Sequence, residues 1–134
     1  MSWKALKLTM VCSAALLLPC CGSNQRLLGI NVTPTAITFG SSDPTLNAQL
    51  TATGVYTHPP ANKDITTQVT WSSSVAGVAV VNSSGKVSPT GSECGVTNIT
   101  ASLQTNDPTG NVVSGTMTVT VNGPATDGCP STPI

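Results

Sequence analysis

Residues 113–121 read Val-Ser-Gly-Thr-Met-Thr-Val-Thr-Val, so apolar or small residues alternate with hydroxylated ones at every step. Neighbouring side chains of a β-strand point to opposite faces of the sheet, and this alternation therefore predicts a strand with one buried face. Weaker runs of the same kind, separated by Gly, Pro, Asn, Asp and Ser, occur over residues 30–39, 46–53, 65–72, 78–81 and 98–103 and around Val87. We therefore expect about seven short strands.

The composition agrees with a fold built from strands alone. The 134 residues include 21 Thr and 14 Val, and β-branched residues favour strands over helices. Seven such strands predict an all-β, two-sheet antiparallel β-sandwich, because a single sheet would leave its apolar face in water. The alternation predicts core positions at Leu50, Val69, Trp71, Ile99 and Val119.

The first twenty residues differ from the rest and are typical of a secretory signal peptide. Lys4 and Lys7 come before or at the start of a mostly apolar run, Leu8 to Leu18, which is about half as long as a bilayer-spanning helix. Small and polar residues follow this run. We expect residues 1–20 to be removed on export; a buried N-terminal helix is the alternative.

The end of this leader, Pro19-Cys20-Cys21-Gly22, resembles a bacterial lipoprotein processing site, where a Cys after an apolar run is acylated and becomes the new N-terminus. That pattern has a small residue before the acylated Cys, so Pro19 disfavours Cys20 and we expect lipidation at Cys21. Lipidation at Cys20 and ordinary cleavage after Ser23 are the alternatives. A lipid on Cys21 implies attachment to a membrane, and Gly22 indicates the outer membrane by analogy with lipoprotein sorting.

Segments in the middle of the chain share the order and spacing of one family pattern: Val32-Thr33-Pro34, Leu46–Ala52, Val69-Thr70-Trp71-Ser72-Ser73-Ser74, Val78–Asn82, Gly85-Lys86-Val87 and Gly95–Ala101. Together they resemble the bacterial immunoglobulin-like domain, group 2, found in intimin- and invasin-type surface proteins. The resemblance covers about residues 30–122 and implies an Ig-like sandwich with a role in cell adhesion. Four features depart from the family: about two extra residues between Ser74 and Val78, Glu93 and Cys94 before the strand that begins near Val96, a tail over residues 123–134, and a single copy of the domain.

Two cysteines remain to pair once the leader is removed and Cys21 is acylated. If the strands over residues 96–103 and 113–121 pair antiparallel, Cys94 and the end of the last strand lie at the same end of the sandwich. Cys129 follows seven residues after Asn122, a reach of about 23 Å, while neighbouring strands are only about 4.8 Å apart. We therefore hypothesise a Cys94–Cys129 disulfide, in a compartment where disulfides persist.

Charge and motif content exclude several classes of function. Five basic and five acidic residues give a net charge of zero, which provides no basic surface for nucleic acid. The single His, His58, lies beside two prolines, and a solvated turn residue is the simplest interpretation. Asp107 with two nearby asparagines is read as a hairpin turn rather than a Ca²⁺ site. We expect no catalytic residue, metal site or cofactor.

The expected organisation is a lipoprotein-type signal peptide (1–20), a short linker (21–29), a bacterial Ig-like domain (30–122) and a C-terminal tail (123–134). The expected function is that of a non-enzymatic cell-envelope lipoprotein. Its single domain would serve as a structural or protein-binding module, with an envelope protein or surface ligand as partner. The alternative is a carbohydrate-binding module, for which only Tyr56 and Trp71 could stack on a sugar ring.

Overall fold

The computed structural model describes residues 25–123, and within this range it is all-β, which confirms the expected Ig-like sandwich. No helix in this range is long and apolar enough to cross a membrane. The strands are β1 (Arg26–Thr33), β2 (Ala36–Phe39), β3 (Ala48–Gln49), β4 (Thr51–Thr57), β5 (Ala61–Asp64), β6 (Thr70–Ser73), β7 (Ala79–Val81), β8 (Lys86–Pro89), β9 (Gly95–Gln104) and β10 (Val112–Val121).

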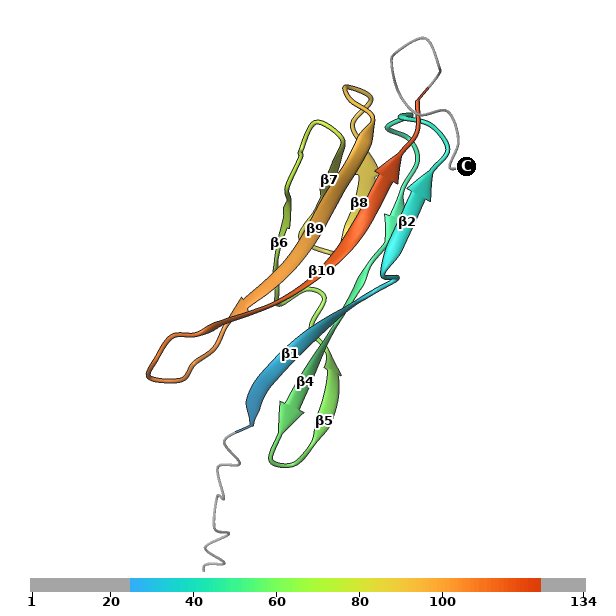
Figure 1. Ribbon diagram of the computed structural model, residues 1–134. Coiled ribbons are helices and arrows are strands. Elements are labelled where there is room, and N and C mark those ends of the chain that lie inside the picture. Colours follow the sequence, from blue (N-terminus) through green and yellow to red (C-terminus); the bar gives the residue numbers. More distant parts are fainter. Residues whose placement is uncertain (1–24, 124–134) are drawn as a thin grey trace, which may run out of the picture.

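The strands form two layers (Figure 1). One layer is a four-stranded sheet in the order β2-β10-β9-β6. The other contains two three-stranded sheets, β1-β4-β5 and β3-β8-β7. Only Leu50 separates β3 from β4, and its N–H donates to the Gly85 carbonyl at 2.8 Å, so the two smaller sheets are joined end to end. We therefore regard β3 and β4 as two parts of one strand of the sandwich.

The first strand of the sandwich changes layers at Pro34. Before this residue β1 pairs antiparallel with β4, and after it β2 pairs parallel with β10, with Ile37 opposite Val119. Proline supplies no N–H to a ladder and is confined to edges and kinks, which is why the sequence predicts an interruption here. The layer change is the reason that one predicted strand, 30–39, is two strands in the structure.

The two layers touch through their backbones where β1 crosses β10. A Cβ atom added to Gly115 would lie 2.1 Å from the Ile30 carbonyl oxygen, so only glycine permits this approach. Packed sheets usually lie about 10 Å apart. Beyond the crossing, the β9–β10 hairpin diverges from β1, β4 and β5 (Figure 1). We call this part the splayed end: the start of β1, the β4–β5 turn and the β9–β10 hairpin.

The core lies between the layers on the other side of this crossing and continues past it. Leu50, Ile99 and Val119 are completely buried, Val69 is buried, and Trp71 is half-buried with its ring packed against the core. The Trp71 indole N–H donates to the Thr66 carbonyl at 2.9 Å, which satisfies the polar end of the side chain.

Three local features differ from the sequence expectations. Residues 65–69 form a turn rather than part of a strand, with the Val69 N–H donating to the Ile65 carbonyl at 3.1 Å. Strand β5 was not expected, because Ala61–Asp64 lacks the apolar alternation of a half-buried strand. Strand β1 begins at Arg26, inside the expected 21–29 linker, because Leu27 is already buried.

The crossing at Gly115 gives a direct test of the fold. We predict that Gly115→Ala lowers the free energy of unfolding by at least about 2 kcal/mol, because the added methyl group meets backbone rather than a movable side chain. Urea denaturation measures the change. The matched control is Gly40→Ala, where nothing lies within 4 Å of the added Cβ and we expect a change below about 0.5 kcal/mol. Equal effects of the two substitutions would contradict the prediction.

Candidate functional site

Of the predicted disulfide and lipidation residues, Cys94 is the one that the structure describes. Cys94 is half-buried directly before β9, and Gly95 pairs with Val121, so Cys94 lies next to the place where the chain leaves β10. This is the arrangement that the proposed bridge requires. Cys129 and Cys21 both lie outside residues 25–123, and the pairing and the lipidation therefore stay predictions.

The three aspartates of the described range hold turns. The carboxylates of Asp43, Asp64 and Asp107 each accept the backbone N–H of the Thr two positions later, at 2.8, 2.9 and 3.0 Å. These Asp-x-Thr segments are Asx-turns, in which the side chain replaces a backbone acceptor. No group of three or more potential metal-ligating residues occurs within residues 25–123.

Asp107 has the most extensive set of these contacts. Its carboxylate accepts hydrogen bonds from the backbone and hydroxyl of Thr109 and, at 3.5 Å, from the Asn111 N–H. The Thr109 hydroxyl makes the largest contribution to lowering the pKa of Asp107 to about 2, since these donors stabilise the ionised form. The carboxylate is therefore a fixed part of the β9–β10 hairpin, as the hairpin interpretation expects.

A buried hydroxyl joins the Trp-Ser-Ser-Ser segment to β9. Thr97 is buried, and its Oγ1 accepts the Val75 N–H at 2.9 Å. The hydroxyls of Ser73 and Ser74 lie 2.9 and 3.2 Å from the same oxygen. The Ser74 hydroxyl also accepts the Asn98 N–H at 3.0 Å. These serines are thus used to attach the end of β6 to β9, and sequence reasoning matched this motif to the family without finding its structural role.

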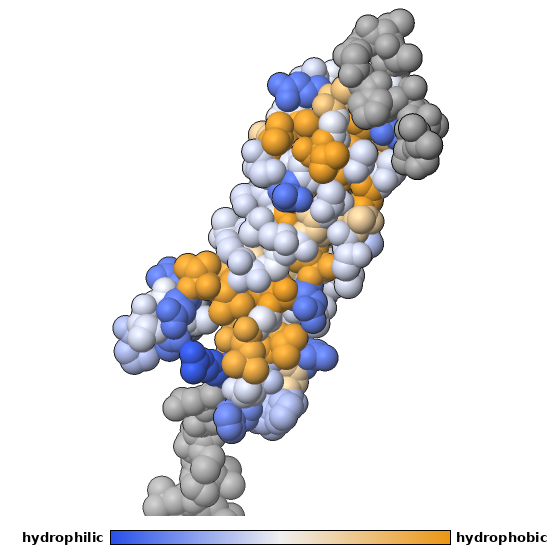
Figure 2. Space-filling model, in the orientation of Figure 1, coloured by the Kyte–Doolittle hydropathy of each residue, from blue (hydrophilic) through white to orange (hydrophobic). Residues whose placement is uncertain are grey.

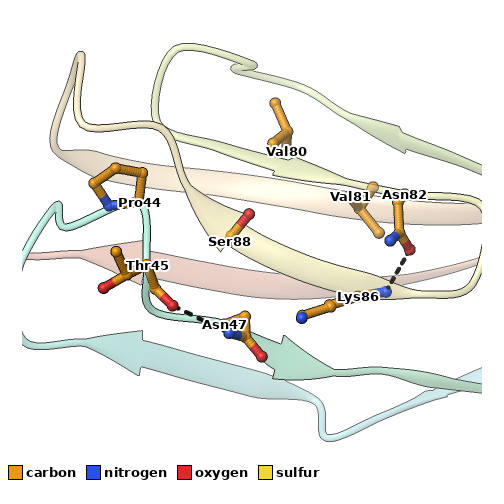
Figure 3. A pocket seen from close by; sticks show the side chains of 8 residues that line it. All are labelled: Pro44, Thr45, Asn47, Val80, Val81, Asn82, Lys86 and Ser88. Atoms are coloured by element: carbon orange, nitrogen blue, oxygen red, sulfur yellow. Dashed lines mark hydrogen bonds between the residues drawn. The ribbon is translucent and has the colours of Figure 1, made fainter.

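A shallow cleft lies between the β2–β3 loop and the β7–β8 hairpin, with a volume of about 390 Å³ (Figure 3). Pro44, Thr45 and Asn47 line one side, and residues of β7 and β8, including the exposed Val80, line the other. Lys86 contributes its ammonium group. The Asn82 side chain accepts the Lys86 backbone N–H at 3.0 Å and fixes the adjacent turn. The cleft combines an apolar wall with one positive charge.

A larger groove, of about 640 Å³, opens between the layers at the splayed end. Leu27, Tyr56 and Leu103 form its apolar part, and its polar lining comes from Gln25, Arg26, Gln68, Gln104, Thr105, Asn106 and Asp107. The Lys63 ammonium lies 5.1 Å from the centre of the Tyr56 ring and hydrogen-bonds the Gln25 side chain. Sequence reasoning did not find this groove, because it exists only where the Gly115 crossing lets the layers diverge.

His58 lies exposed in the β4–β5 turn with a positive φ of 54°. Tyr56 is half-buried at the groove, and Trp71 is half-buried against the core with its indole N–H already bonded. The two aromatic side chains considered for sugar stacking therefore lie on different strands, β4 and β6, in different layers.

Comparison of the chain with models of protein families finds no match, and no curated protein matches the sequence. The resemblance to the group 2 bacterial Ig-like domain therefore rests on the quoted segments and enters below as part of a proposal.

The contacts of Asp107 predict how the β9–β10 hairpin responds to acid. Because its folded-state pKa is depressed, the stabilisation is present above the unfolded value of about 3.9 and is lost as the pH falls through about 2. Thr109→Ala removes the main donor and should raise the pKa of Asp107 toward its ordinary value. The carboxyl chemical shift, followed by NMR as a function of pH, measures this. An unchanged midpoint in the variant would refute the assignment; Thr116→Ala, on the exposed face of β10, is the control.

Proposed function

We propose that this protein is a non-enzymatic cell-envelope lipoprotein, anchored in the outer membrane by a lipid on Cys21, whose single group 2-type Ig-like domain serves as a structural or protein-binding module. The observation that carries the proposal is the position of the sandwich relative to the leader. Strand β1 begins at Arg26, five residues after Cys21. A lipoprotein-type leader thus leads almost directly into a complete β-sandwich.

The short connection limits where the domain can work. Four residues, 22–25, join Cys21 to β1, and an extended chain of this length spans at most about 14 Å. With Cys21 acylated, the splayed end is the part of the sandwich next to the membrane. The opposite end, which carries the β2–β3, β6–β7 and β8–β9 connections, faces away from it.

The outward half has the better surface for a protein partner. Its exposed apolar side chains are Leu46, Val75, Val80 and Val96, and Val80 lines the cleft of Figure 3 beside Lys86. Exposed apolar residues next to one charge suit a protein contact. The few charges of the chain imply weak electrostatic steering, so a partner is expected to share the same envelope rather than be captured from a distance.

Lipidation is tested by metabolic labelling with an alkyne fatty acid in cells that express the full chain. We predict that the parent protein and Cys20→Ser incorporate the label, whereas Cys21→Ser does not and accumulates with its leader attached. Cys20→Ser is the matched control because it changes the neighbouring thiol. If Cys20→Ser loses the label and Cys21→Ser retains it, the lipidated residue is Cys20 rather than Cys21. If the parent protein takes up no label, the proposed lipid anchor is wrong.

The disulfide is tested on protein purified from membranes without reductant. We predict that a thiol-alkylating reagent adds no mass before reduction and two adducts after it. A bridge closing a loop of about 36 residues stabilises by roughly 4 kcal/mol in the chain-entropy model, so Cys94→Ser should lower the urea midpoint markedly. Two reactive thiols in the unreduced protein would contradict the Cys94–Cys129 pairing.

A further inference from the structure

The splayed end exposes two large apolar side chains on separate strands. Leu28 is 57% exposed on β1, where a register shift between Leu27 and Gly29 displaces it from the ladder. Val112 is 64% exposed at the first position of β10. The space-filling view shows apolar side chains on this half as well as on the opposite half of the molecule (Figure 2). Leu28 and Val112 belong to different layers, so each layer of the splayed end exposes one apolar side chain.

The charges of the described residues are unevenly divided between the two ends. Arg26 lies at the start of β1, and the Lys63 side chain reaches the same region through Gln25 and the Tyr56 ring. Two of the three basic residues in residues 25–123 thus lie toward the splayed end, with Asp107 in its hairpin and Asp64 next to Lys63 on β5. At the opposite end, Asp43 and Glu93 lie in the β2–β3 and β8–β9 connections. Two basic side chains, Arg26 and Lys63, therefore lie on the side where the chain enters β1, whereas the outward half has one, Lys86.

The length of chain before β1 identifies what this end meets. From Gln25, four residues back reach Cys21 at a distance of at most about 14 Å. An acyl anchor on Cys21 holds the splayed end against the phospholipid headgroups, where apolar side chains insert about 5–10 Å and basic residues attract anionic lipid.

We propose that the splayed end is a membrane-docking surface, in which Leu28 and Val112 enter the interfacial region of the bilayer and Arg26 and Lys63 contact lipid phosphates. The inference rests on the proposed lipoprotein anchor and adds to it a fixed orientation. The sandwich would stand on the membrane with the cleft of Figure 3 directed outward, rather than move freely about its linker.

Tryptophan reporters in the anchored protein test the docking. Leu28→Trp and Val112→Trp are made separately, and each lipidated protein is placed in vesicles of phosphatidylethanolamine and phosphatidylglycerol. We expect a blue-shifted emission and the loss of about half the reporter fluorescence when the lipids are brominated, since interfacial insertion brings the indole near the acyl chains. Emission from Trp71 is subtracted with the parent protein.

The matched control is Val96→Trp, because Val96 is 58% exposed at the opposite end of β9. It should show no quenching. Arg26→Gln combined with Lys63→Gln should reduce the quenching of the Leu28→Trp reporter in these anionic vesicles but not in neutral phosphatidylcholine vesicles. Equal quenching at positions 28, 112 and 96, or none at 28 and 112, would overturn the docking surface.

The anchor and the docking surface are tested separately. Intact mass shows whether Cys21 carries lipid before any vesicle is used. If it does not, the proposed anchor fails, and the same reporters are measured with the mature chain tethered to chelating lipids through an N-terminal histidine tag. Quenching at positions 28 and 112 in that arrangement supports the docking surface on its own, and its absence overturns it.

Discussion

The contact between the backbones of β1 and β10 at Gly115 organises the rest of the molecule. It brings the Ile30 carbonyl against a residue without a side chain, so two layers that would otherwise be separated by interdigitated side chains meet directly. On one side of this point the layers enclose the core around Leu50, Ile99 and Val119. On the other they diverge and form the groove lined by Leu27, Tyr56 and Leu103. A single glycine thus divides a packed half from an open half.

The polar residues of the sandwich are used mainly to make structure. The Thr97 hydroxyl accepts the Val75 N–H and hydrogen-bonds the hydroxyls of Ser73 and Ser74, and the Trp71 indole N–H donates to the Thr66 carbonyl. No buried side-chain nitrogen or oxygen within residues 25–123 lacks a hydrogen-bond partner. A buried polar group without a hydrogen-bond partner costs free energy. Because the buried hydroxyl and amide groups of this range are all hydrogen-bonded, a chain rich in Thr and Ser can form a stable interior. This hydrogen bonding also gives a physical reason for the Trp-Ser-Ser-Ser segment, which the sequence analysis treated only as a family pattern.

The sequence predicts an element of the fold well when the residues that determine it are close together in the chain. Strand β10 follows from its alternation, and the Asp-x-Thr turns follow from a side chain and a backbone group two residues apart. The segment 65–72 misled the prediction, because Ile65 and Val69 are both buried whether the intervening residues form a strand or a turn. Strand β5 carries no apolar alternation, since it is an edge strand with mostly exposed residues. The groove depends on Ile30 meeting Gly115, a contact between residues far apart in the chain, and no local pattern indicates it.

The parallel pairing of β2 with β10 has a mechanical consequence. The chain enters the sandwich at the splayed end and leaves β10 at the opposite end (Figure 1), while the Ala36–Phe39 ladder joins the entering segment to the departing one. Tension between an N-terminal anchor and anything that grips the chain beyond Gly123 would pull these two strands past each other along their length. The hydrogen bonds of that ladder would then bear the load together, in shear, rather than open one after another as in a peeled hairpin. Such a geometry raises the barrier to forced unfolding along this direction.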